Sequence, residues 1–259
     1  MVNVENKLQL KPYPIGWKAK LGFLIPSHDS GYGSYEFQVM SPDGVVPLET
    51  RVMVRKVAKD ELERAADDAL VGAEMLATAH VDILDYIATA TCFVLGVKGE
   101  ADLVKKMQAK TGIQSTAGGQ SVVAALEFVG AKKILTYTPY NREVEDISRH
   151  YFEDSGFEIV GARNLQFEDP SNINRVSPYE ILADIVKLHK QNPGADGVFV
   201  VGGCFRTLEI VDELEKAIDI PVVGTQQANM WHCLQMCEVP DLLPGFGRLL
   251  DTPRHKKAK

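Results

Sequence analysis

The sequence has few cysteines and no long apolar run. Its 259 residues include 4 cysteines at irregular spacing, which excludes a disulfide framework and predicts reduced thiols. No apolar segment approaches the ~20 residues that a membrane-spanning helix needs. The N-terminus is polar where a signal peptide carries an apolar stretch. We therefore expect a cytoplasmic protein that does not bind membranes.

An excess of positive charge is also lacking. There are 28 Lys and Arg against 35 Asp and Glu, a formal net charge of −7, so the chain lacks the positive field that binds phosphate backbones. Nucleic acid is therefore not an expected partner. The basic residues near the C-terminus, Arg254, Lys256, Lys257 and Lys259, are interpreted as a solvated tail. With 45% hydrophobic residues, the chain is large and apolar enough for one or two domains.

Motifs for metals and nucleotides are missing as well. Cys233 and Cys237 stand four residues apart with His232 adjacent, but no second Cys/His pair completes a tetrahedral set. We interpret these two cysteines as buried helix residues. Gly118-Gly119 and Gly202-Gly203 lack the spacing of phosphate-binding loops. No metal and no cofactor are predicted.

Short apolar runs alternate with helical patterns along the chain. Strands are predicted at Lys20–Pro26, Arg51–Val57, Ile83–Ala88, Lys133–Thr138, Phe157–Ala162, Gly197–Val201 and Pro221–Val223. Helices are predicted at Asp60–Ala77 (with Asp60 as its cap), Glu143–Asp154, Tyr179–Lys190, Leu208–Ala217 and Ala228–Met236. Leu103–Lys110 is interpreted as the end of a further helix, and Gly112 and Gly130 as helix stops. This alternation predicts an α/β fold with parallel sheets and right-handed crossovers.

The two halves of the sequence resemble each other. Leu21–Asp29 aligns with Ile134–Arg142, and Asp82–Ala88 aligns with Asp196–Gly202 at nearly the same offset. A duplicated unit explains this, so we predict two pseudosymmetric Rossmann-like domains with a cleft between them. The predicted division is 18–118 plus 224–250 for the first domain, 119–223 for the second, and tails at 1–17 and 251–259.

The cleft is expected where the strands end, because ligands of parallel α/β sheets bind outside the carboxyl ends of the strands. The segments that the repeat places there are Pro26–Asp29, Ala88–Cys92, Pro139–Asn141 and Gly202–Phe205.

Several motifs in order resemble one family. They are LIPS at Leu24–Ser27, ATATCFVLG at Ala88–Gly96, TPY at Thr138–Tyr140, GGCFRTLEIVDELE at Gly202–Glu215 and PVVGTQQANMWH at Pro221–His232. From about Leu21 to Leu234 the chain is similar to the aspartate/glutamate racemase superfamily, in its maleate cis-trans isomerase and arylmalonate decarboxylase branch. The resemblance implies a homo-oligomeric, cofactor-independent isomerase or lyase that acts on a small carboxylic or dicarboxylic acid between two domains.

The reactive residues depart from the family pattern. In the family each half supplies a cysteine, and those positions align here with Ala88 and Gly202. Cys92 and Cys204 lie further along, but their offset differs from that of the repeat, so they are not symmetric substitutes. Asp29 stands where the maleate isomerases have an asparagine. We therefore name Asp29 as the candidate general base and Cys204 as a second catalytic candidate, with His28 as an alternative acid or base.

The predicted substrate-binding set supplies hydroxyl and backbone N–H donors, which hold a carboxylate at the start of a helix. Its members are Pro26, Ser27, Ala88, Thr89, Ala90, Thr138, Tyr140, Gly202 and Gly203. Two functions remain open. One is an isomerase or decarboxylase that works without the cysteine pair, and the other is a catalytically inactive relative that binds small carboxylates.

Overall fold

Two four-stranded parallel sheets form the centre of the protein. The computed structural model describes residues 13–29, 31–54, 59–167 and 170–254. The first sheet has the order β2-β1-β3-β4 and the second has the order β6-β5-β7-β8. The strands are β1 (Ala19–Pro26), β2 (Val45–Val52), β3 (Ile83–Tyr86), β4 (Ser115–Ala117), β5 (Lys133–Thr138), β6 (Glu158–Asn164), β7 (Gly197–Val200) and β8 (Val222–Gly224).

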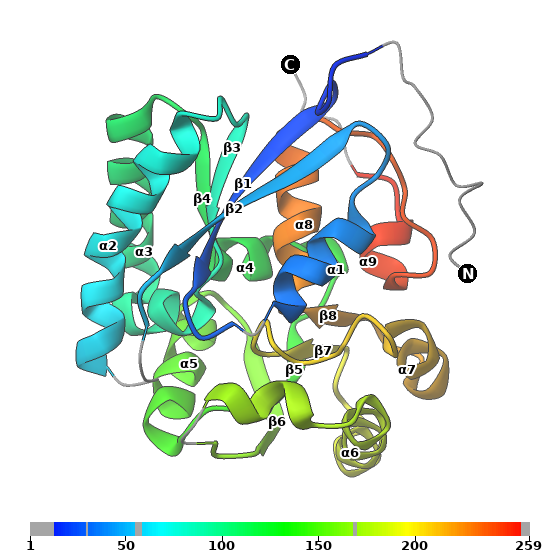
Figure 1. Ribbon diagram of the computed structural model, residues 1–259. Coiled ribbons are helices and arrows are strands. Elements are labelled where there is room, and N and C mark those ends of the chain that lie inside the picture. The colour runs from blue at the N-terminus through cyan, green and yellow to red at the C-terminus, as the bar shows by residue number, and fades with distance from the viewer. Residues whose placement is uncertain (1–12, 30, 55–58, 168–169, 255–259) are drawn as a thin grey trace, which may run out of the picture.

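Helices cover both sheets. They are α1 (Tyr32–Met40), α2 (Lys59–Ala77), α3 (Thr89–Thr111), α4 (Gly118–Phe128), α5 (Arg142–Asp154), α6 (Pro178–Gln191), α7 (Val211–Ile218), α8 (Thr225–Met236) and α9 (Gly247–Asp251), with a 3-10 turn at Pro170–Arg175. Figure 1 shows α2 and α3 on one face of the first sheet, and α1 with α8 on the other. The chain thus returns to the first sheet after completing the second.

The register of the two sheets confirms the internal repeat. Leu24 of β1 pairs with Tyr86 at the end of β3, and Tyr137 of β5 pairs with Val200 at the end of β7. These pairs are related by nearly the same offset that aligned the two halves of the sequence. The predicted α/β class with parallel sheets is confirmed.

The second strand differs from the prediction. A strand was expected over Arg51–Val57, whereas β2 covers Val45–Val52 and residues 55–58 lie outside the described part of the chain. Pro47 made this segment a poor strand candidate, yet β2 lies at the edge of its sheet, where a missing N–H donor is tolerated. The side chain of Asp60, the expected cap of α2, also lies outside the described set.

Helix ends follow the glycine signals. Gly112 adopts the left-handed conformation, with φ of 73°, and caps the C-terminus of α3, as predicted. Gly130, the other predicted helix stop, also adopts the left-handed conformation, with φ of 79°, and follows Val129 at the end of α4. At the start of α5, the Asn141 side chain accepts a hydrogen bond of 3.0 Å from the Val144 N–H.

One contact between the two halves is buried. Phe93 of α3 packs against Tyr151 and Phe152 of α5, with ring centroids 5.1 and 5.3 Å apart. The buried Glu100 carboxylate accepts hydrogen bonds from the Tyr151 hydroxyl and from the Gln120 N–H. Burial raises the pKa of Glu100, while these donors oppose that effect.

A second contact joins the halves through α1. The Tyr32 hydroxyl donates to Glu209 over 2.7 Å near the surface, and the buried Glu36 accepts a hydrogen bond from the Leu208 N–H over 3.2 Å. Burial raises the pKa of Glu36 well above its usual value. Among the described residues, the polar contacts between the halves thus include buried ones at Glu100 and Glu36 and a more exposed one at Tyr32.

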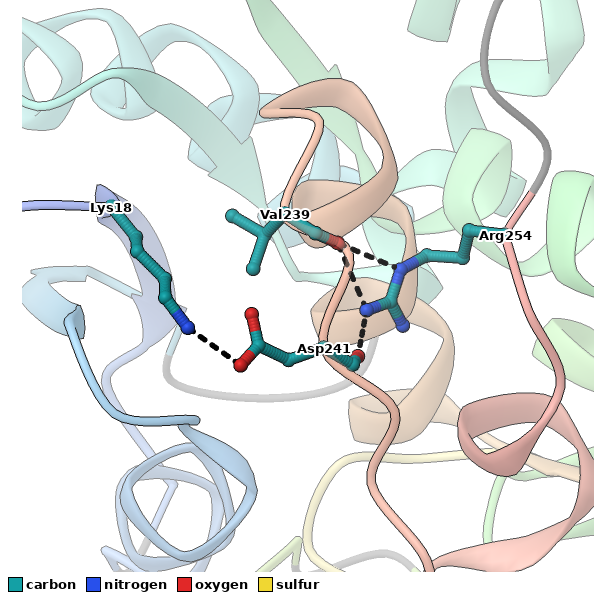
Figure 2. A network of polar contacts seen from close by, with 4 residues as sticks. All are labelled: Lys18, Val239, Asp241 and Arg254. Atoms are coloured by element: carbon teal, nitrogen blue, oxygen red, sulfur yellow. Dashed lines mark hydrogen bonds and ion pairs between the residues drawn. The ribbon is translucent and has the colours of Figure 1, made fainter.

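The segment after α8 is fastened to the start of β1. Figure 2 shows Lys18 in an ion pair of 2.6 Å with Asp241, and Arg254 donating to the backbone oxygens of Val239 and Asp241. The expectation of a solvated tail is therefore wrong for Arg254, which is half-buried because its guanidinium has carbonyl partners. Lys256, Lys257 and Lys259 lie outside the described residues.

None of the four cysteines forms a disulfide, as predicted. Cys92, Cys204 and Cys233 are buried, and Cys237 is half-buried at the end of α8. The interpretation of Cys233 as a buried helix residue is confirmed. Among the described helices, none has the length and apolar character that crossing a membrane requires.

Candidate active site

A cavity lies at the carboxyl ends of strands from both sheets. It contains about 560 Å³ of empty space, part of which is open to solvent. The lining residues are Pro26, His28, Asp29, Val54, Ile87, Ala88, Thr89, Ala90, Thr91, Tyr140, Ile173, Gly202, Gly203, Cys204 and Gln226. All of the predicted site residues line this cavity except Ser27 and Thr138.

The first half presents a helix N-terminus to the cavity. β3 ends at Tyr86 and α3 begins at Thr89, so the first turn of α3 directly follows the strand. N–H groups in a first turn have no intrahelical acceptor, and no acidic side chain occupies this turn. The Thr91 hydroxyl accepts a hydrogen bond of 3.2 Å from Tyr86. This end of the cavity is suited to an anion.

Tyr140 lies beside this helix terminus, in the turn after β5. The Thr138 hydroxyl accepts a hydrogen bond of 3.3 Å from the Tyr140 N–H and so shapes the turn rather than lining the cavity. Burial raises the pKa of Tyr140 above its usual value, so the phenol keeps its proton and serves as a neutral donor.

Ser27 also has a structural role. Its hydroxyl donates to the Val54 carbonyl over 3.1 Å and accepts from the Val54 N–H over 2.9 Å. Both interactions tie the end of β1 to the residues after β2. Neither Ser27 nor Thr138 is among the residues that line the cavity. The structure therefore gives no support to the prediction that these two residues contact a substrate.

The second half presents a loop instead of a helix. Gly202 has φ of 105°, a conformation that favours glycine, and its N–H donates to the Thr225 hydroxyl over 3.0 Å. Ala88 and Gly202 each lie two residues after a strand end, at equivalent points of the two repeats. Neither of these equivalent positions carries a thiol.

The nearby cysteines occupy different environments. Cys204 lines the cavity, next to Gly203. Cys92 is fully buried outside the lining and interacts with Glu100 and the Gly119 backbone, and burial raises the pKa of its thiol well above the usual value. Cys92 is therefore placed as a core residue.

Asp29 and His28 form the wall of the cavity after β1. Asp29 Oδ1 accepts a hydrogen bond of 2.8 Å from the Gly31 N–H, while the Arg51 guanidinium binds the Asp29 backbone oxygen at 2.7 Å. Burial lowers the pKa of His28, and the neighbouring Asp29 charge opposes that shift. His28 is therefore neutral at pH 7.

Sequence reasoning missed Gln226, a polar lining residue, as well as the apolar lining residues Val54, Ile87 and Ile173. Gln226 lies in the first turn of α8, directly after β8, and is 3% exposed. The rule that ligands meet strand ends, applied to β8 as to the other strands, would have pointed to the segment that contains it. Neither its Nε2 nor its Oε1 has a hydrogen-bond partner among the described residues. A buried amide without partners is costly, so this side chain needs an explanation.

The fold and the cavity define a class of protein: a two-sheet α/β protein with its site between the sheets, at the strand ends. The model of the arylmalonate decarboxylase family matches residues 22–250, which is most of the chain, and the protein belongs to this family. This assignment confirms the branch that the sequence motifs resemble.

Individual relatives agree with the family. The chain is 24% identical over 170 residues to an arylmalonate decarboxylase of Bordetella bronchiseptica, covering 65% of this chain and 71% of the relative. It is 25% identical over 222 residues to a maleate isomerase of Pseudomonas putida, covering 82% and 87%. The fold matches the structure of a Pseudomonas putida S16 maleate isomerase variant with maleate, at a TM-score of 0.85 and 20% identity, covering 90% of this chain and 97% of that one.

Proposed function

We propose that this protein is an isomerase or lyase that acts on a small carboxylic acid in the cavity between the two sheets. The observation that carries the proposal is the first turn of α3, which offers N–H groups to the cavity beside the neutral phenol of Tyr140. Such donors stabilise a carboxylate and also the enolate that develops when its α-carbon loses a proton or carbon dioxide. Membership of a family with decarboxylases and isomerases among its relatives supports this reaction type.

Proton transfer is assigned to Asp29, with Cys204 as the second group. Asp29 takes a proton from the substrate carbon, and the electron pair left on that carbon is delocalised into the bound carboxylate. Cys204, in the loop after β7, returns a proton to that carbon. Because Ala88 and Gly202 stand at the two equivalent strand ends, this route does not use a symmetric pair of thiols. The neutral His28 is the alternative base.

Proton NMR tests the activity directly. The protein is incubated with maleate, an arylmalonate and a panel of other small mono- and dicarboxylic acids in deuterium oxide, and conversion or deuterium uptake is followed. We expect Asp29→Asn to lower the rate at least a hundredfold. Asp102→Asn is the matched control, since Asp102 is exposed on α3 and pairs with Lys105. Absence of turnover for every acid, or an unchanged rate in Asp29→Asn, contradicts the enzymatic proposal.

The absence of reactive side chains at the same two strand ends favours a second function, which is binding without catalysis. Ala88 and Gly202 carry no group that reacts, so a protein that binds a small carboxylate without converting it also fits the cavity. This function predicts that small carboxylates raise the melting temperature while their NMR spectra stay unchanged, because a ligand of the native state stabilises it. Conversion of any bound ligand eliminates it.

A further inference from the structure

Gln226 is placed in the cavity by two glycines. A Cβ atom on Gly203 would lie 2.8 Å from Gln226 Nε2, and a Cβ atom on Gly33 would overlap the same nitrogen. Gly33 belongs to α1 and Gly203 to the loop after β7, so both halves leave room for this one side chain. The amide is nevertheless without a hydrogen-bond partner among the described residues. The space is therefore arranged for an amide whose partner comes from outside the chain.

Asp29 faces the same point. The Cβ atom on Gly33 would also lie 2.6 Å from Asp29 Oδ2, so this oxygen and Gln226 Nε2 are close neighbours on one wall of the cavity. Asp29 Oδ1 accepts from the Gly31 N–H, and no hydrogen bond to Oδ2 is found among the described residues. The wall thus offers a carboxylate oxygen that accepts and an amide N–H that donates, side by side.

We propose that the ligand is a small hydroxy-substituted monocarboxylic acid, whose hydroxyl group lies between Asp29 and Gln226 while its carboxylate lies at the first turn of α3. This inference rests on the proposed carboxylate site and names the substrate class that the site takes. A hydroxyl group donates one hydrogen bond and accepts others, so it satisfies Asp29 Oδ2 and Gln226 Nε2 at once.

Other substituents match this wall less well. A second carboxylate would face the Asp29 carboxylate, and like charges a few ångströms apart repel strongly in a partly buried site. Arg51 does not offset this repulsion from within the cavity, since it lies outside the lining and binds the backbone oxygens of Pro26 and Asp29. An ammonium group donates only, which leaves the Gln226 N–H without an acceptor.

Four saturated acids that differ at one carbon test the assignment. They are butanoate, 4-hydroxybutanoate, succinate and 4-aminobutanoate, and their dissociation constants are measured by isothermal titration calorimetry with the full chain. We expect 4-hydroxybutanoate to bind about tenfold more tightly than butanoate and succinate, which is the contribution of one or two satisfied hydrogen bonds. Succinate or 4-aminobutanoate as the tightest ligand overturns the inference.

Substitutions connect the preference to Gln226. In Gln226→Met we expect the advantage of 4-hydroxybutanoate over butanoate to disappear while butanoate binding stays the same. Gln191→Met, at the exposed end of α6, is the matched control and keeps the preference. Gly203→Ala displaces Gln226 through the added Cβ atom and gives the same loss without altering the amide itself. Equal weakening of all four ligands in Gln226→Met assigns the residue a purely structural role and overturns the inference.

The outcomes separate this inference from the proposed function. If none of the four acids binds and none of the broader panel is converted, the carboxylate site itself fails. If the acids bind with equal affinity, the carboxylate site stands and the hydroxyl assignment fails.

Discussion

The two repeats share a strand register and differ in the segments that leave their strands β3 and β7. β3 leads within three residues into α3, whereas β7 leads into the loop 201–210 before α7 begins. The first end therefore supplies a helix N-terminus, and the second supplies a glycine-containing loop that approaches Gln226 of α8. Duplication produced a symmetric scaffold, but the cavity between the halves is asymmetric. It suits a ligand with two unlike ends.

The largest effect is expected from a negative charge at the helix end of the cavity. In Ala90→Asp we expect small carboxylates to bind at least a hundredfold more weakly, because like charges about 4 Å apart repel by several kcal/mol at intermediate dielectric. An acidic residue in the first turn of a helix is itself favourable, so the variant should fold. Titration calorimetry with butanoate measures the loss.

Ala90→Asn is the control for this change, since it has nearly the same shape and no charge. We expect it to bind butanoate within a few-fold of the unaltered protein. Undiminished binding in Ala90→Asp would show that the carboxylate does not lie at α3, and the contrast between the two cavity ends would then be wrong.

Smaller effects are expected at two tyrosines whose hydroxyl groups join the halves. Tyr151→Phe removes a hydroxyl that donates to the buried Glu100, and we expect a loss of about 1–3 kcal/mol in the free energy of unfolding. Tyr32→Phe removes the same group from the partly exposed contact with Glu209, and we expect a loss below about 1 kcal/mol. Urea unfolding of both variants measures the difference. Equal losses would show that burial does not distinguish these contacts.

The smallest effect concerns His28, whose counterpart in the second repeat is the non-titrating Asn141. Burial lowers the pKa of His28, so the native state takes up its proton less readily than the unfolded chain, and stability falls as pH decreases below about 6.5. Between pH 7 and pH 5 we expect the unaltered protein to lose more stability than His28→Gln. Urea unfolding at pH 5, 6 and 7 measures this.

The matched control for that change is His150→Gln, which alters an exposed histidine of α5. Its stability should vary with pH as in the unaltered protein. If His28→Gln shows the same pH dependence as this control, burial of His28 does not shift its titration.

Strand ends were predictable because their signal is local. Buried strands such as β3 and β7 are short apolar runs, and aligning these runs is enough to locate Ala88 and Gly202 at the strand ends. α1 was missed because its N-cap residue, Gly31, has no side chain to cap the helix and because Gly33 lies in its first turn. Gln226 was missed because nothing in its local sequence distinguishes a cavity amide from the adjacent Gln227, which binds backbone groups on both sides.

The sequence by itself determined the duplicated α/β scaffold and the absence of thiols at both equivalent strand ends. Those properties follow from hydrophobic period and from residue identity, which are local. Only the tertiary structure decided that Gly33, Gly203 and Asp29 lie close to Gln226, and that Ser27 and Thr138 bind backbone groups and are not among the lining residues. Side chains distant in sequence meet there because helices of the two halves, such as α3 and α5, pack against each other, and packing is a property of the whole chain.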